Sequence, residues 1–348
     1  MSEYEKLYNF LNLYKAHRKA RLGKQENSEV ILFEMDLAHS LIRLSDKLKD
    51  HSYQISDYYS FTVHDPKERV IYTLHYPDRV VQHCLCDEII PPVLEPKLIY
   101  DNAACRTAKG THFAINRLTK FMSDHAHQFG INGWVLKCDI RKYFDNIDHA
   151  VLKQKLRKVF PDPDVLEHLE MIIDSYHTQP GIGLPLGNQS SQWFALYYLD
   201  ELDRYAKEKL RIKRYVRYMD DFVLIHPDKE YMKFCRRLLA DLLENRLHLE
   251  FNQKTQIIPL KNGIDFLGFH FYLSESGKVI RKVRGRTKTK YHRRLKQMQY
   301  LFSEGSVSAD DVHQVLASYK AHLDHGHTWK LQRKSMSTFF LTRRDDVQ

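Results

Sequence analysis

The sequence predicts an α+β fold in which helices surround a small antiparallel sheet. Apolar side chains recur with a helical period over most of the chain. Short runs of β-branched and aromatic residues occur in pairs that are separated by turn residues. No repeat, low-complexity stretch or long linker interrupts this pattern. With 348 residues the chain is long enough for two or three subdomains that each bury a core.

The elements follow one another as helices, a strand pair, more helices and strands, and a basic helical tail. Predicted helices cover residues 4–24, 28–50, 78–90, 112–129, 149–159, 164–176, 190–210 and 229–247. Predicted strands cover residues 58–63, 69–74, 134–140, 214–218, 221–225, 248–251, 257–259 and 265–272.

Composition indicates a nucleic-acid partner. The chain has 54 Lys and Arg against 44 Asp and Glu, which gives a net charge of +10. With 12% aromatic residues and 20 histidines, this balance fits nucleic acid better than a disordered basic tail, and the alternative is a merely soluble basic protein. We expect no membrane association and a cytoplasmic protein, because no long apolar run and no signal-peptide core is present. The five cysteines fit no zinc spacing and are expected to be reduced thiols.

An acidic pair lies between two strand-like runs at Tyr218-Met219-Asp220-Asp221. A turn needs no such pair, since adjacent carboxylates repel each other and glycine or asparagine turns more easily. The alternative for an acidic pair in a turn is simple solvation. A bound Mg²⁺ removes the repulsion, because hard cations take carboxylate oxygens as ligands.

A third carboxylate, Asp139, ends the predicted strand 134–140. If neighbouring antiparallel strands carry it and the acidic pair, the three side chains converge. Such a cluster holds two Mg²⁺ ions, with Mn²⁺ as a possible substitute, roughly 3.5–4 Å apart for in-line phosphoryl transfer. The carbonyl of Ile140 is a further candidate ligand. A triphosphate also needs cations, for which Lys67, Arg69, Arg79 and Arg106 are candidates, although each alone could be a solvated surface charge.

The order of these motifs resembles the reverse transcriptase family over about residues 55–275. The motifs that carry the resemblance are Lys67 and Arg69, the stretch 78–82, Arg106 with 109–111, Asp139-Ile140 with 143–145, 183–192, 218–221, 254–255 and 266–269. The resemblance implies an RNA-directed DNA polymerase with a right-hand fold. It also implies an N-terminal helical segment (1–54), fingers (55–135), a palm with fingers-like insertions (136–272) and a helical basic thumb (273–348).

The resemblance assigns roles to individual positions. Asp139, Asp220 and Asp221 match the catalytic metal ligands. Phe144 matches the aromatic residue that closes the sugar pocket against a 2′-hydroxyl, so the substrates should be dNTPs; its alternative is core packing. The other nucleotide-binding candidates are Lys67, Arg69, Arg79, Leu186, Gln192 and Lys254.

Two departures narrow the resemblance. Leu186 stands between Pro185 and Gly187 where most reverse transcriptases have glutamine, and an apolar side chain lacks that hydrogen bond. With Ser191-Gln192, this version resembles the reverse transcriptases of diversity-generating retroelements, which copy a template RNA into error-prone cDNA with a small basic helical accessory protein. The alternatives are an antiphage reverse transcriptase that uses a dedicated non-coding RNA, and a non-catalytic RNA-binding scaffold. An RNA-directed RNA polymerase is disfavoured by Phe144.

Clustered cations near the C-terminus indicate contact with a template and primer backbone, with a solvated charged helix as the alternative. The nucleic-acid-binding candidates are Arg106, Lys109, Arg281, Lys282, Arg284, Arg286, Lys288, Lys290, Arg293 and Arg294. His322, His325 and His327 show no complete metal-ligand pattern, so we expect a structural or RNA-contacting role for them.

Overall fold

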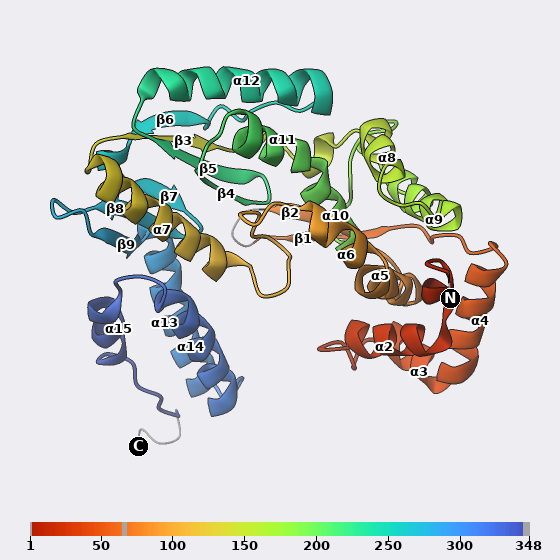
Figure 1. Cartoon of the computed structure of the whole chain (residues 1–348). Helices are drawn as coiled ribbons and strands as arrows, with labels where there is room; N and C mark the ends of the chain where they lie inside the picture. The colour runs from red at the N-terminus through yellow and green to blue at the C-terminus, as the bar shows by residue number, and fades with distance from the viewer. Residues whose placement is uncertain (1, 65–67, 344–348) are drawn as a thin grey trace.

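The computed structural model describes residues 2–64 and 68–343 (Figure 1). It is a mixed structure of helices and small antiparallel sheets, as the sequence predicts. The N-terminal helices lie at the right of Figure 1 and the C-terminal helices at the lower left, with a central sheet above and a strand pair between them.

Each of the first two predicted helices is two helices. The chain forms α1 (Glu5–Tyr8), α2 (Phe10–Ala20), α3 (Ser28–Met35) and α4 (Leu37–Lys49). The side chain of Asn9 accepts hydrogen bonds from the backbone N–H groups of Leu11 and Asn12, which caps α2 and ends α1. Asp36 leaves the helical region, with φ −137° and ψ 56°, and so separates α3 from α4.

A two-stranded sheet follows. Strands β1 (Tyr59–Val63) and β2 (Arg69–Thr73) pair antiparallel, with Tyr59 opposite Thr73. Helix α5 (Tyr76–Glu88) begins two residues earlier than predicted, because Pro77 occupies its first turn, where proline is tolerated. The short helices α6 (Ile90–Leu94) and η1 (Glu95–Lys97) then lead towards α7 (Thr111–Phe129).

The central sheet has the strand order β4-β5-β3-β6. Its strands are antiparallel and span β3 (Trp134–Cys138), β4 (Arg214–Tyr218), β5 (Asp221–His226) and β6 (Gln256–Pro259). The predicted strand at 248–251 is wrong, since His248 ends α12 (Lys229–Leu247) in a left-handed conformation and only Phe251 forms an isolated bridge, to Ile140.

Alternation along the strands divides the core between the two faces of this sheet. Leu136 and Leu224 join the main core with residues of α12, whereas Val135 and Val223 join a second core with residues of α7. Figure 1 shows α12 and α7 on opposite sides of the sheet. A sheet covered on both faces is a rigid support for side chains at its strand ends.

The region between β3 and β4 is helical. It contains η2 (Phe144–Asn146), α8 (His149–Arg157), α9 (Pro163–Asp174), α10 (Gln189–Tyr198), α11 (Asp200–Arg204) and the π-helical turn η3 (Tyr205–Lys209). The single helix predicted for 190–210 is therefore a series of three segments.

A third sheet contains β7 (Ile264–Phe266), β8 (Phe269–Leu273) and β9 (Val279–Val283). The single strand predicted for 265–272 is wrong, because Leu267 (φ 46°) and Gly268 (φ 90°) form a tight turn that reverses the chain. After β9 come α13 (Gly285–Ser303), α14 (Ala309–Leu323) and α15 (Trp329–Met336), which share a small core around Tyr291, Leu295 and Leu323.

Within the described residues, none of the helices combines the length and the apolar character that a bilayer crossing requires. The five cysteines are free thiols; Cys105 is exposed and the other four are buried.

Candidate active site

The β4–β5 hairpin and its neighbour β3 bring the three aspartates together. Tyr218 pairs with Asp221, so Met219 and Asp220 form a two-residue turn. Cys138 at the end of β3 pairs with Phe222 of β5, which places Asp139 beside Asp221. The convergence that the sequence suggested therefore follows from the register of two strand pairs.

Burial makes the charges of this acidic group costly. Burial raises the pKa of Asp221 from 3.8 to about 7, and the carboxylates of Asp220 and Asp139 add to this rise while Lys137 opposes it. Burial and the charge of Asp139 also raise the pKa of Asp220. The Oδ1 atom of Asp221 is buried and has no hydrogen-bond partner among the described residues. The site thus has excess negative charge and an unpaired ligand atom, and both features fit a divalent cation.

The three carboxylates are within electrostatic range of one another but not in close contact. We searched the described residues for three His, Cys, Asp or Glu side chains whose ligand atoms all lie within 4.8 Å of one another. His51, Asp164 and Glu167 meet this criterion, whereas Asp139, Asp220 and Asp221 do not. Ile140, whose carbonyl is the further candidate ligand, is 2% exposed and forms an isolated bridge with Phe251.

Lys137 was not singled out from the sequence. Its Nζ atom lies 3.7 Å from Oδ2 of Asp221 and donates to the carbonyl of Asp265 at 2.6 Å. The sequence signal that could have identified it is a lysine within an otherwise apolar strand. The ammonium offsets part of the negative charge, whereas Asp220 and Asp139 form no ion pair within residues 2–64 and 68–343.

A buried ion pair supports the hairpin turn and was also missed. Arg217 of β4 and Asp203 of α11 both have fully buried side chains, and the guanidinium donates to the two carboxylate oxygens at 2.7 and 2.6 Å. Arg217 also donates to the carbonyl of Met219 at 2.9 Å. Met219 has φ 55°, a conformation that L-residues rarely adopt. The ion pair therefore holds a strained turn in place.

The cations predicted near a triphosphate lie on separate elements. Lys67 lies outside the described residues. Arg69 is exposed at the start of β2, and its charge lowers the pKa of Asp220 against the larger effect of burial. Arg79 is half-buried on α5, where burial lowers its pKa. Lys254 is exposed in the turn before β6.

The loop at 183–188 is fixed against the β1–β2 hairpin. The backbone N–H of Leu184 donates to the carbonyl of Phe144 at 2.8 Å, and Phe144 is half-buried against the main core. A Cβ at Gly187 would lie 1.7 Å from the carbonyl oxygen of Tyr72, so no other residue fits there without movement of the backbone. Leu186 is 38% exposed beside it, and Gln192 is half-buried on α10.

Arg106 and Lys109 make contacts within the protein. The side chain of Arg106 is 6% exposed and binds Glu95 and the carbonyls of Ile99 and Asn102. Lys109 donates to the carbonyl of Tyr100, and burial, followed by the charge of Arg106, lowers its pKa to about 8. These contacts hold the Arg106 guanidinium within its own loop, whereas the sequence offered it as a candidate cation for a triphosphate or nucleic acid.

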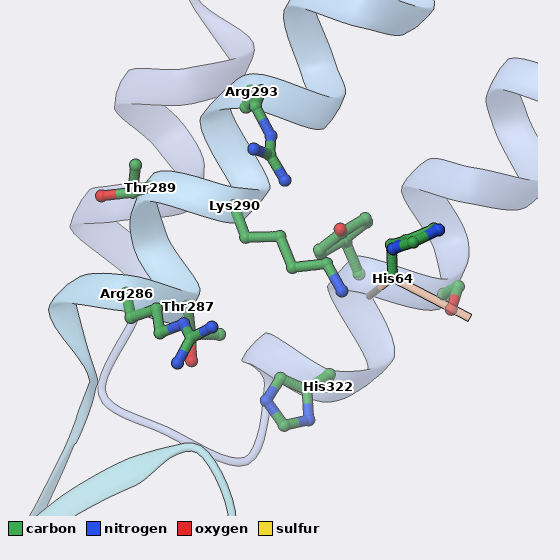
Figure 2. A pocket seen from close by; sticks show the side chains of 9 residues that line it. His64, Arg286, Thr287, Thr289, Lys290, Arg293 and His322 are labelled. Atoms are coloured by element: carbon green, nitrogen blue, oxygen red, sulfur yellow. The ribbon is translucent and has the colours of Figure 1, made fainter. Parts of the chain in front are cut away.

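A cleft of about 1000 Å³ separates the β1–β2 hairpin from α13 and α14 (Figure 2). Lys290 and Arg293 of α13 extend into it on the side opposite His64. Its lining residues are His64, Arg286, Thr287, Thr289, Lys290, Arg293, Ser318, Tyr319 and His322. A cationic cleft with hydroxyl groups and a tyrosine suits the sugar-phosphate backbone of a nucleic acid.

The remaining basic candidates lie on β9, on α13 and between these two elements. Arg284 pairs with Asp265 at 3.1 Å, and Lys282 lies over the Tyr272 ring. Arg281 donates to Asn116 at 3.3 Å, and Arg294 donates to Gln297 at 2.9 Å. Lys288 is exposed on α13 and lines a different cavity.

The C-terminal histidines have structural contacts. His327 Nδ1 accepts the backbone N–H of Arg281, and the rings of His325 and His112 have centroids 3.5 Å apart. His322 lines the cleft and lies next to Phe269.

Replacing Arg217 with Met should destabilise the protein by about 3–5 kcal/mol, because Asp203 is left charged and unpaired in the core. Urea unfolding measures this loss. The matched control is the double variant Arg217→Met with Asp203→Leu, which should recover part of the lost stability; a single variant as stable as the parent would contradict the role of the pair.

The raised pKa of Asp221 predicts a pH-dependent stability. The folded chain holds this proton more tightly than the unfolded chain, so ionisation costs stability as the pH rises from 3.8 towards about 7. In EDTA at pH 8, Asp221→Asn should therefore be more stable than the parent by on the order of 2 kcal/mol. Thermal melts should show that this difference shrinks on acidification, whereas exposed Asp241→Asn should show no such trend. A gain that does not change with pH would contradict the assigned pKa.

Comparison with known proteins agrees with this geometry. The family model described as "Reverse transcriptase (RNA-dependent DNA polymerase)" matches residues 64–271. Protein YkfC of Escherichia coli (strain K12) is 26% identical over 230 residues, which cover 55% of this chain and 60% of that protein.

Two solved structures share the fold. Apo telomerase from Candida tropicalis truncated from its C-terminal domain has a TM-score of 0.51 and 14% identity, covering 66% of this chain and 55% of that chain. Apo telomerase from Candida tropicalis has a TM-score of 0.50 and 13% identity, covering 75% of this chain and 56% of that chain. The chain thus spans little more than half the length of the relatives it matches. Because the family model matches more than half of the chain, the chain belongs to the reverse transcriptase family.

Proposed function

We propose that this chain is an RNA-directed DNA polymerase whose catalytic residues are Asp139, Asp220 and Asp221. The observation that carries the proposal is the buried, unbalanced negative charge at the ends of β3 and β5. In this proposal residues 1–54 form an N-terminal helical segment, 55–135 the fingers, 136–272 the palm and 273–348 the thumb. The protein works in the cytoplasm of a bacterium or on behalf of a phage.

The three aspartates would hold two Mg²⁺ ions, or Mn²⁺ in their place, with the carbonyl of Ile140 as a further ligand. Bound ions of this kind lower the pKa of an attacking hydroxyl and stabilise a departing pyrophosphate. Arg217 and Asp203 keep the turn that presents Asp220 in one conformation. Lys137 positions Asp221 through its contact at 3.7 Å.

The substrates in this proposal are dNTPs. Arg69 acts electrostatically on Asp220, so its side chain can contact a triphosphate held at the aspartates. Lys67, Arg79 and Lys254 are further candidates for the same charge. Phe144 selects against a 2′-hydroxyl, and Leu186 and Gln192 contact the incoming nucleotide.

The template is an RNA that shares the cleft with the cDNA product. The cations of α13 at this cleft contact phosphates without reading bases, so binding should depend strongly on salt.

The biological role that the sequence favours is diversity generation with a small basic accessory protein. Leu186 supports it, because its exposed apolar side chain offers no hydrogen bond for base selection. An antiphage enzyme with a dedicated non-coding RNA is the second candidate. The buried acidic group argues against a non-catalytic scaffold, since buried like charges have no purpose in RNA binding.

Asp220→Ala should abolish DNA synthesis, by at least about 1000-fold, because it removes a metal ligand. Primer extension on an RNA template measures this loss, and filter binding should show nearly unchanged RNA affinity. Exposed Asp241→Ala is the matched control, with unchanged synthesis. Synthesis by Asp220→Ala at the parental rate would overturn the assignment of the active site.

Arg293→Ala should weaken binding of an RNA–DNA duplex and reduce the slope of log K against log salt by about 1, as the loss of one phosphate contact requires. Lys296→Ala changes an exposed cation of the same helix at a different cavity and is the matched control. If the parent and Arg293→Ala showed equal slopes of log K against log salt, the sugar-phosphate backbone of the duplex would lie outside this cleft.

Sequencing of the cDNA against the co-purifying RNA should show substitutions concentrated at template adenines. Leu186→Gln should reduce this error rate several-fold, because glutamine restores a hydrogen bond in the nucleotide pocket. Faithful cDNA from the parent would support the antiphage role. An unchanged error spectrum in Leu186→Gln would show that residue 186 does not set base selection.

A further inference from the structure

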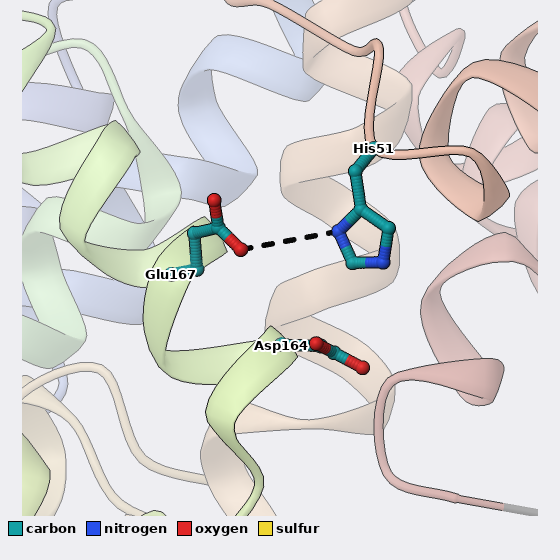
Figure 3. Close-up of side chains that lie close together, drawn as sticks. All are labelled: His51, Asp164 and Glu167. Atoms are coloured by element: carbon teal, nitrogen blue, oxygen red, sulfur yellow. Dashed lines mark ion pairs between the residues drawn. The ribbon is translucent and has the colours of Figure 1, made fainter.

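A second cluster of potential ligands lies away from the aspartates. The ligand atoms of His51, Asp164 and Glu167 all lie within 4.8 Å of one another, and Figure 3 shows the three side chains converging. His51 follows α4, whereas Asp164 and Glu167 belong to the first turns of α9. The cluster therefore joins two segments that are more than a hundred residues apart in the sequence.

A fourth polar group lies at the same place. His51, Asp164, Glu167 and His168 all line a cavity of about 460 Å³. His168 is 5% exposed, and its Nε2 atom has no hydrogen-bond partner among the described residues. Asp164, Glu167 and His168 are spaced i, i+3 and i+4, so they share one face of α9. The Nε2 atom is closed to solvent, so His168 forms part of the cavity wall without reaching an ion in it.

The imidazole of His51 is held in position by its surroundings. Its backbone is in the left-handed region, with φ 60°, and its ring stacks on Tyr4 at 5.1 Å and 10°. Tyr4 is fixed in turn, because its hydroxyl donates to the carbonyl of Leu48 at 2.8 Å and its N–H to Asp162 at 3.1 Å. Such support is what a preorganised ligand needs.

His51 and Glu167 form a loose and exposed pair, with 44% and 76% of their side chains accessible to solvent. His51 Nδ1 and Glu167 Oε2 are 4.0 Å apart, too far for a hydrogen bond, and the Asp164 carboxylate forms no ion pair with a described residue. One imidazole nitrogen with two carboxylates is a ligand set for zinc-like ions, whereas Mg²⁺ prefers oxygen ligands alone.

We propose that His51, Asp164 and Glu167 bind a zinc-like divalent ion, with water in the remaining coordination position. The ion links the N-terminal helices to α9. Its role is structural, because none of its ligands belongs to β3, β4 or β5.

Calorimetric titration of the EDTA-treated full chain with Zn²⁺ in excess Mg²⁺ tests this site. We expect one Zn²⁺ per chain and a rise in Tm of about 5 °C when Zn²⁺ exceeds its Kd a hundredfold. His51→Ala and Glu167→Gln should each weaken binding by at least about tenfold and remove the rise in Tm. Their melts without Zn²⁺ should match the parent, which shows that both variants fold.

Two controls separate this site from other sources of binding. His39→Ala removes an exposed histidine that pairs with Asp36 and should leave the titration unchanged. Asp220→Asn should also bind Zn²⁺ as the parent does. Zn²⁺ binding that survives His51→Ala and Glu167→Gln, or that disappears in Asp220→Asn, would overturn the proposal.

Discussion

The register between β3 and β5 is the constraint on which the site depends. Because Cys138 pairs with Phe222, Asp139, which follows β3, lies beside Asp221, the first residue of β5. A slip by one residue would turn every side chain of β3 to the other face and bury Lys137 against the main core. The two hydrophobic cores, with α12 on one face and α7 on the other, therefore fix the geometry of the acidic group as much as they stabilise the fold.

Arg217 and Asp203 extend this constraint from the sheet to the turn. Their ion pair is isolated from water, so both charges are retained only because each satisfies the other. Tyr215 donates to Asp203 as well, at 2.5 Å, so two side chains of β4 are bound to α11. Arg217 also donates to the carbonyl of Leu196 in α10 at 3.0 Å, so the helix that follows the 183–188 loop is bound to the hairpin that bears Asp220.

The sequence predicted the elements whose signals are local. The hairpin at 214–225, α12 and the strand before Asp139 could be found because their patterns are strong over short windows. The breaks at Asn9, Asp36 and Leu267 could not, since each depends on a single backbone conformation. The Arg217–Asp203 pair and the contacts of Arg106 within the protein were missed for another reason. The sequence alone does not show whether the fold places an oppositely charged side chain next to a given charged residue.

The contact between Gly187 and the carbonyl of Tyr72 has a consequence for how this loop can evolve. Position 187 has no room for a side chain, so any substitution of Gly187 must displace the local backbone. Leu186 is 38% exposed, so its side chain is less restricted by neighbouring atoms. Substitutions in this loop are therefore easier to accommodate at 186 than at 187, and the backbone that carries the loop stays the same.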